Sequence, residues 1–143
     1  TPTEAFTVEA TTILTLGDSA ALRTVDVDAP SGIAVSKWVS TSPEPRGWHH
    51  FILRATIGSQ TRDFSDDGQR GLPLPAGLRV DFQSVPLDAS GNPIGTPTPW
   101  HWNLRSLGND PARGNGVRFR ISIDETQAGA AVSVDSLTFH YGC

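Results

Sequence analysis

The sequence predicts an all-β protein, an antiparallel β-sandwich or jelly roll of about eight strands with no long helix. Three observations support this fold class. Apolar and polar residues alternate in several short segments, which is typical of strands with one buried face. Clusters of Gly, Pro, Asn, Asp and Ser separate these segments, as turns do in sandwiches and barrels. The apolar spacing of an amphipathic helix never continues for three turns.

The clearest strand pair lies at 117–141. Along 117–123 every second residue is apolar, which places one face of this strand in the core. The chain turns at 125–129 and returns as a second strand. In that strand the apolar register changes between Val134 and Leu137. An odd offset within a continuous strand predicts a β-bulge near Asp135.

Further strands are expected at 6–16, 21–28, 33–38, 48–57 and 78–83. Twelve apolar residues at alternating positions are predicted to lie in the core: Phe6, Val8, Val25, Val27, Val35, Leu53, Val80, Phe82, Phe119, Ile121, Leu137 and Phe139. The 48–57 strand also has an apolar residue on its second face, Ile52. It is therefore expected to be central in a sheet or to contact a neighbouring subunit.

The chain has 143 residues, the ordinary size of one domain, so 1–143 is predicted to be a single domain. Residues 1–5 are expected to form a loose N-terminal arm, and 58–77 a long loop of the kind that carries function or contacts. No apolar run approaches the roughly 18 residues of a membrane span. The polar, acidic start does not resemble a signal peptide, so either one was removed or none was present.

The net charge of −4 argues against general binding to nucleic acid. All but one of the 11 basic residues are Arg, which suits protein–protein contacts and equally fits a GC-rich genome. Cys143 is the single cysteine, so neither an intrachain disulfide nor a thiolate metal cluster is possible. Its thiol either stays free or links two chains.

Two aromatic–histidine segments, 48–50 and 100–102, stand out. If 100–102 is extended, its two Trp side chains point to the same side and form a platform that can stack on a sugar ring. The candidate ligand-binding residues are Trp48, His49, Trp100, Trp102, Asn103 and Arg105. The alternative is that these Trp residues lie in the core or anchor a subunit interface, where Trp is enriched.

No metal or other cofactor is predicted. Asp63, Asp66 and Asp67 form the best candidate calcium site, because Ca²⁺ prefers several loop oxygens. The calcium-loop pattern is incomplete, and a solvated acidic loop is the expected alternative. No Ser lies in Gly-x-Ser-x-Gly and no phosphate-cradling glycine loop occurs, so the chain is not expected to be an enzyme.

Two segments resemble known β-modules. Residues 24–40, TVDVDAPSGIAVSKWVS, resemble a strand–Pro-x-Gly–strand segment of bacterial and bacteriophage surface modules, although a Gly-rich run is replaced by Ser36-Lys37-Trp38. Residues 132–143, VSVDSLTFHYGC, resemble the closing strand of jelly-roll carbohydrate-binding modules. These resemblances imply an accessory β-sandwich and transfer no functional residue.

The predicted function is a non-catalytic structural module that assembles on a larger surface, such as a bacteriophage capsid decoration or appendage protein. It would lie on a virion or an extracellular surface. The alternative is a lectin-like carbohydrate-binding module. Protein partners are expected, as a homo-oligomer (a trimer or a dimer) or as a surface lattice, with a glycan as the alternative ligand. Ile52, Leu72 and Leu74 are the predicted interface, unless the 58–77 loop covers its own domain.

Overall fold

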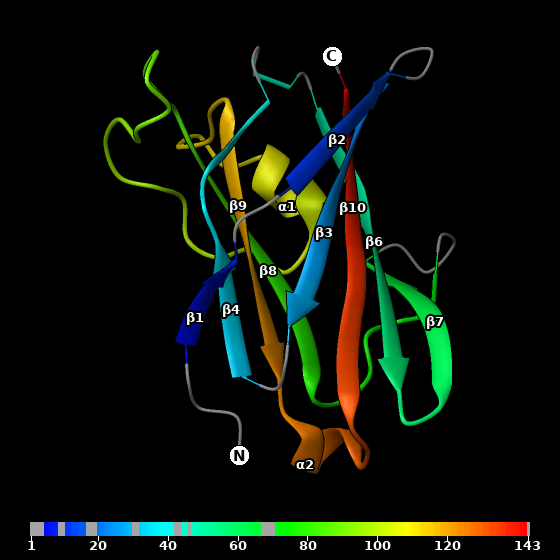
Figure 1. Cartoon of the computed structure of the whole chain (residues 1–143). Helices are drawn as coiled ribbons and strands as arrows, with labels where there is room; N and C mark the ends of the chain where they lie inside the picture. Colours follow the sequence, from blue (N-terminus) through cyan, green and yellow to red (C-terminus); the bar gives the residue numbers. More distant parts are fainter. Residues whose placement is uncertain are drawn as a thin grey trace.

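The computed structural model describes residues 5–8, 11–16, 20–29, 32–41, 44–45, 47–66 and 71–142. Over these ranges the chain forms two five-stranded β-sheets and two short helices (Figure 1). The structure therefore confirms the all-β class and the absence of a long helix in the described part. Neither helix has the length and apolar character that crossing a membrane requires.

Strand β9 (Gly116–Ile123) organises the first sheet. It pairs along its whole length with antiparallel β8 (Leu78–Val85). Its other edge is shared by β4 (Gly32–Ser36) and the two-residue β5 (Val39–Ser40), both antiparallel to it. Strand β1 (Ala5–Val8) extends this sheet by parallel pairing with β4. Strand β8 consequently lies at a sheet edge.

The second sheet is fully antiparallel and has the order β2-β3-β10-β6-β7. Its strands are β2 (Thr11–Leu16), β3 (Ala20–Ala29), β10 (Val132–Gly142), β6 (Gly47–Ile57) and β7 (Gln60–Ser65). Strand β10 is central, between β3 and β6, and its register shifts between Val134 and Ser136 against both neighbours. The predicted bulge is thus confirmed at its predicted place.

Aromatic side chains join the two sheets face to face. The ring of Phe82 on β8 lies 5.4 Å from that of Phe51 on β6 and 6.0 Å from that of Phe139 on β10. Seven predicted core residues are buried: Leu53, Val80, Phe82, Phe119, Ile121, Leu137 and Phe139. Val35 is half-buried. The side chains of the other four predicted core residues, which lie on β1 and β3, are outside the described part.

The predicted 58–77 loop contains a strand that the sequence analysis missed. Gly58, with a φ of 62°, lets the chain reverse over two residues, and β7 then pairs with β6. The described residues therefore contain ten strands rather than about eight. The turn expected at 125–129 contains helix α2 (Glu125–Ala128), whose first amides donate to the Asp124 carboxylate. Helix α1 (Leu104–Gly108) is the other short helix.

Candidate functional site

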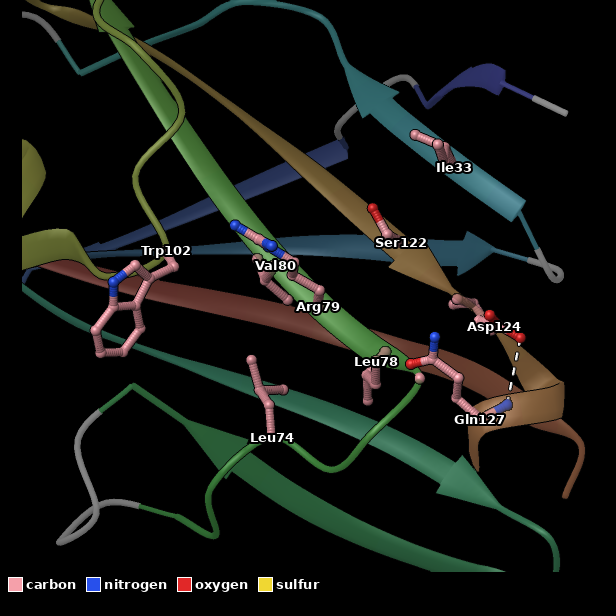
Figure 2. A pocket seen from close by; sticks show the side chains of 11 residues that line it. Ile33, Leu74, Leu78, Arg79, Val80, Trp102, Ser122, Asp124 and Gln127 are labelled. Atoms are coloured by element: carbon pink, nitrogen blue, oxygen red, sulfur yellow. Dashed lines mark hydrogen bonds between the residues drawn. The ribbon is translucent and has the colours of Figure 1, made fainter. Parts of the chain in front are cut away.

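A groove with a volume of about 470 Å³ opens beside the edge of β8 (Figure 2). Leu74, Leu78 and Val80 supply much of its apolar lining. Trp102 stands at one end of the groove, and Asp124 and Gln127 stand at the other (Figure 2). The lining therefore combines an aromatic ring, aliphatic side chains and polar groups from segments far apart in the sequence.

Main-chain pairing with β8 fixes the position of Trp102. The Phe82 amide donates to the His101 carbonyl at 2.7 Å, and the His101 amide donates to the Phe82 carbonyl at 2.8 Å. Directly after Trp102, Asn103 caps helix α1 by accepting a hydrogen bond from the Ser106 amide. Trp102 is held between these two anchors, and 60% of its surface stays exposed.

The polar side chains of the groove keep unused hydrogen-bonding capacity. Arg79 donates from Nε to Asp81, and Asp124 accepts from α2 amides through Oδ1. Within the described ranges, the terminal Arg79 nitrogens, the Asp124 Oδ2 atom, the Ser122 hydroxyl and the Gln127 carboxamide have no hydrogen-bond partner. These donors and acceptors are available to a ligand.

Gly77 lines the groove and packs closely against the backbone that leads into α2. The Asp124 amide donates to the Gly77 carbonyl at 2.7 Å. Gly77 has a φ of 85°, and a Cβ atom there would run into the Asp124 carbonyl and lie 2.7 Å from the Ala128 amide nitrogen. A side chain does not fit between the 71–77 segment and the end of β9, so this position requires glycine.

Trp100 lies near Trp102 in sequence but covers charged side chains on the outer face of β9. The guanidinium carbon of Arg120 lies 4.4 Å from the centre of the Trp100 ring. That of Arg118 lies between two rings, 5.2 Å from Trp100 and 4.7 Å from Trp38. Burial, followed by the nearby charge of Arg120, lowers the pKa of Arg118. The half-buried Trp100 ring is thus already engaged by two cations.

The structure does not bring the three candidate ligand-binding Trp residues, Trp48, Trp100 and Trp102, into one site. Trp48 is only 4% exposed, and its ring lies 5.5 Å from that of Tyr141 in the core. Only Trp102 combines strong exposure with a place on the groove. His49 is exposed on β6, and Arg105 is exposed on α1.

The candidate calcium residues bind protein groups instead. Asp63 pairs with Arg54 at 3.0 Å. The Asp66 carboxylate accepts hydrogen bonds from the Leu104 amide at 2.9 Å and the Phe51 amide at 3.0 Å. Burial raises the pKa of Asp66, and these hydrogen bonds oppose the shift. Asp67 lies outside the described residues, among which no group of three or more His, Cys, Asp or Glu could hold a metal ion.

A hydrogen-bonded row of Ser106, His101 and Asp110 was not predicted. Nδ1 of His101 lies 2.6 Å from the Ser106 hydroxyl, and Nε2 lies 2.8 Å from the Asp110 carboxylate. Hydrogen bonds from the Ala112 amide and from His101 lower the pKa of Asp110. The row ties helix α1 and the following turn to the segment beside β8. The only sequence signal for this row was the i, i+5, i+9 spacing of its three residues. None of the three lines the groove.

The predicted interface segment lies between two hollows. Leu72 bridges β7 through main-chain hydrogen bonds to Asp63 and Ser65, and its side chain is 44% exposed. It lines a second hollow of about 220 Å³ together with Phe64. Leu74 lies two residues further on and lines the groove, half-buried. The 72–75 segment therefore covers part of its own domain while leaving Leu72 open to solvent.

Ile52, the remaining predicted interface residue, is half-buried on β6. It pairs in register with Ser65 of β7 and Thr138 of β10, within the second sheet. It does not line either hollow.

Comparison of the chain with protein-family models, with curated proteins and with solved structures gave no match. The resemblance of 24–40 and 132–143 to surface and carbohydrate-binding modules therefore stays a prediction.

Proposed function

We propose that this chain is a non-catalytic structural module that assembles on a larger surface, such as a capsid decoration or appendage protein of a virion or an extracellular surface. The observation that carries the proposal is the exposed Leu72, which is 44% accessible and lines the smaller hollow together with Phe64. Apolar surface of this kind, rimmed by polar residues, is typical of interaction sites.

The position of the 72–75 segment supports protein contacts on this side of the domain. The hollows lie along the edges of β7 and β8, one from each sheet. Strand edges offer main-chain hydrogen bonds to a partner, and the smaller hollow, beside β7, would receive its side chains. A stable contact would bury about 800 Å² per partner. We propose that the first partner is a second copy of the chain, in a closed trimer or dimer, with Ile52, Leu72 and Leu74 at or beside the contact.

The proposal includes a jelly-roll path for the two sheets. The chain crosses repeatedly from one sheet to the other, between β1 and β2, β3 and β4, β5 and β6, β7 and β8, and β9 and β10. Accessory jelly-roll modules would share this repeated crossing between two sheets with the present fold.

Sedimentation velocity at about micromolar concentration tests the assembly. We expect a species larger than the 15.3 kDa monomer and a shift towards monomer in Leu72→Ser. Ile94→Ser is the matched control, because Ile94 is 55% exposed and lines neither hollow. A monomer at every concentration, or equal loss of assembly in both variants, would contradict self-association through this segment.

A further inference from the structure

We propose that the groove beside β8 binds a terminal pyranose ring of a neutral glycan, with the indole of Trp102 as its stacking surface. This site goes beyond the assembly function and does not depend on it. Four groups of observations carry it: the exposed ring, the unused polar groups around it, their balanced charges and the size of the groove.

Trp102 offers a free and fixed aromatic face. Its side chain is 60% exposed, whereas Trp48 is enclosed in the core and Trp100 covers two Arg side chains. Its main chain is held between the His101 pairing with β8 and the Asn103 cap. A ring whose backbone is already ordered loses little conformational entropy on binding. The C–H face of a pyranose ring is the apolar surface that such an indole accepts.

The polar groups of the groove distinguish a sugar from an apolar peptide. Arg79 and Gln127 supply donors, and Ser122, Asp124 and Gln127 supply acceptors. Within the described ranges each has at least one polar atom without a hydrogen-bond partner. An apolar occupant would strip water from these atoms without replacing its hydrogen bonds, which is unfavourable. Sugar hydroxyls both donate and accept hydrogen bonds, so they can satisfy the donors and the acceptors of the groove.

The charges favour a neutral sugar. Arg79 and Arg120 both contact the Asp81 carboxylate at 3.0 Å. The charged side chains that line the groove are Arg79 and Asp124. One guanidinium group and one carboxylate sum to zero, so the lining has no excess charge to attract a sialic or uronic acid.

The groove volume limits the length of the ligand. About 470 Å³ lies within the roughly 300–1,000 Å³ of small-molecule sites. One or two sugar rings fit such a space, with the rest of the glycan extending into solvent. The backbone joint between Gly77 and Asp124 lies at the α2 end, and we expect the rest of the chain to leave past the exposed Trp102.

Acrylamide quenching of tryptophan fluorescence tests this site. The probes are maltohexaose, cellohexaose and mannohexaose, each up to about 10 mM, and a hyaluronan hexasaccharide as the acidic comparison. We expect at least one neutral probe to protect the most quenchable tryptophan, with the acidic probe weaker. Both Trp102 variants lack this fluorophore, so their affinities are measured by isothermal titration calorimetry. Trp102→Ala should lower the affinity about tenfold or more, whereas Trp102→Phe stays within about threefold. Ile94→Ala is the control and should bind unchanged.

A second variant separates stacking from folding. Gln127 is exposed on α2, so Gln127→Ala should keep the fold and still weaken binding about threefold to tenfold. No protection by any neutral probe, preference for the acidic probe, or equal binding by Trp102→Ala would overturn the proposal. Sedimentation of Trp102→Ala keeps the two functions apart, because we expect lost sugar binding with assembly unchanged.

Discussion

The Asp81 carboxylate lies 3.0 Å from a terminal nitrogen of Arg120, and the Asp81 side chain has no exposed surface. A second guanidinium, that of Arg79, reaches the other carboxylate oxygen. The Nε atom of Arg120 is buried and has no hydrogen-bond partner among the described residues. Asp81 is therefore the group that compensates a partly desolvated Arg120 on the outer face of β9.

Replacing Asp81 by Ala should lower the free energy of unfolding by about 3 kcal/mol, because Arg120 would lose its carboxylate partner. Urea unfolding measures this change. Arg79→Ala is the control, since the Arg79 side chain is 63% exposed and its ion pair is worth less than about 1 kcal/mol. Equal effects of the two variants would show that Asp81 does not act through Arg120.

Trp100→Leu should destabilise the fold by about 1–2 kcal/mol, because two guanidinium groups lose their cation–π contact. Trp102→Leu is the matched control. Trp102 lies two residues away, is 60% exposed and should change stability by less than about 0.5 kcal/mol. Thermal unfolding of both variants gives the comparison, and a larger loss in Trp102→Leu would contradict the assignment of the two rings.

Asp66 and Asp110 should give opposite pH dependences. Burial raises the pKa of Asp66 above 3.8, so its contribution to stability is present below that pH and is lost as the pH rises through the folded-state pKa. The pKa of Asp110 is lowered, so its contribution is present above 3.8 and is lost as the pH falls through the folded-state pKa.

Denaturant unfolding between about pH 3 and 7 tests this contrast. The stability difference between the native protein and Asp66→Asn should become less favourable to the native protein as the pH rises. For Asp110→Asn it should become more favourable. Slopes of the same sign would rule out at least one of the two electrostatic environments.

Gly77→Ala should be much more destabilising than Gly91→Ala. Both glycines have a left-handed backbone, with φ values of 85° and 83°, so both variants bear about 1–2 kcal/mol of strain. Only at Gly77 would the new methyl group also meet backbone, that of Asp124 and Ala128. Overpacking should add about 1–3 kcal/mol there, visible as a lower urea midpoint. Equal urea midpoints for the two variants would mean that the 71–77 segment shifts to accommodate the new methyl group at little cost.

The core was predictable because its signal is local. Phe119 and Ile121 alternate with Arg side chains, and β-strand geometry converts that alternation directly into an inside and an outside. The bulge in β10 followed from the same rule. Strand β7 was not predicted, although Gly58-Ser59 is a favourable two-residue hairpin turn and indicates that a strand follows it. The polar residues after that turn carry little alternation, so pairing with β6 decided their conformation.

The groove could not be predicted in the same way. Leu74, Arg79, Trp102, Ser122 and Gln127 meet only after the first sheet and three connections are in place. Proximity in sequence suggested that Trp100 and Trp102 share a platform. Instead, His101 pairs with Phe82, and α1 begins at Leu104, directly after the Asn103 cap. The rings of Trp100 and Trp102 therefore have different surroundings. Exposure of a single Trp is a property of the assembled fold.

The central place of β10 has a consequence for synthesis of the chain. All strands of the first sheet precede residue 124, whereas β3 and β6 become neighbours only through β10, which begins at Val132. A ribosome releases the N-terminal strands first. During translation the edges of β3 and β6 that pair with β10 in the folded protein stay unpaired until β10 is synthesised. This strand emerges roughly a hundred residues after β3. A nascent chain stalled before Val132 would thus display two open strand edges, and these are the surfaces that a chaperone would need to shield.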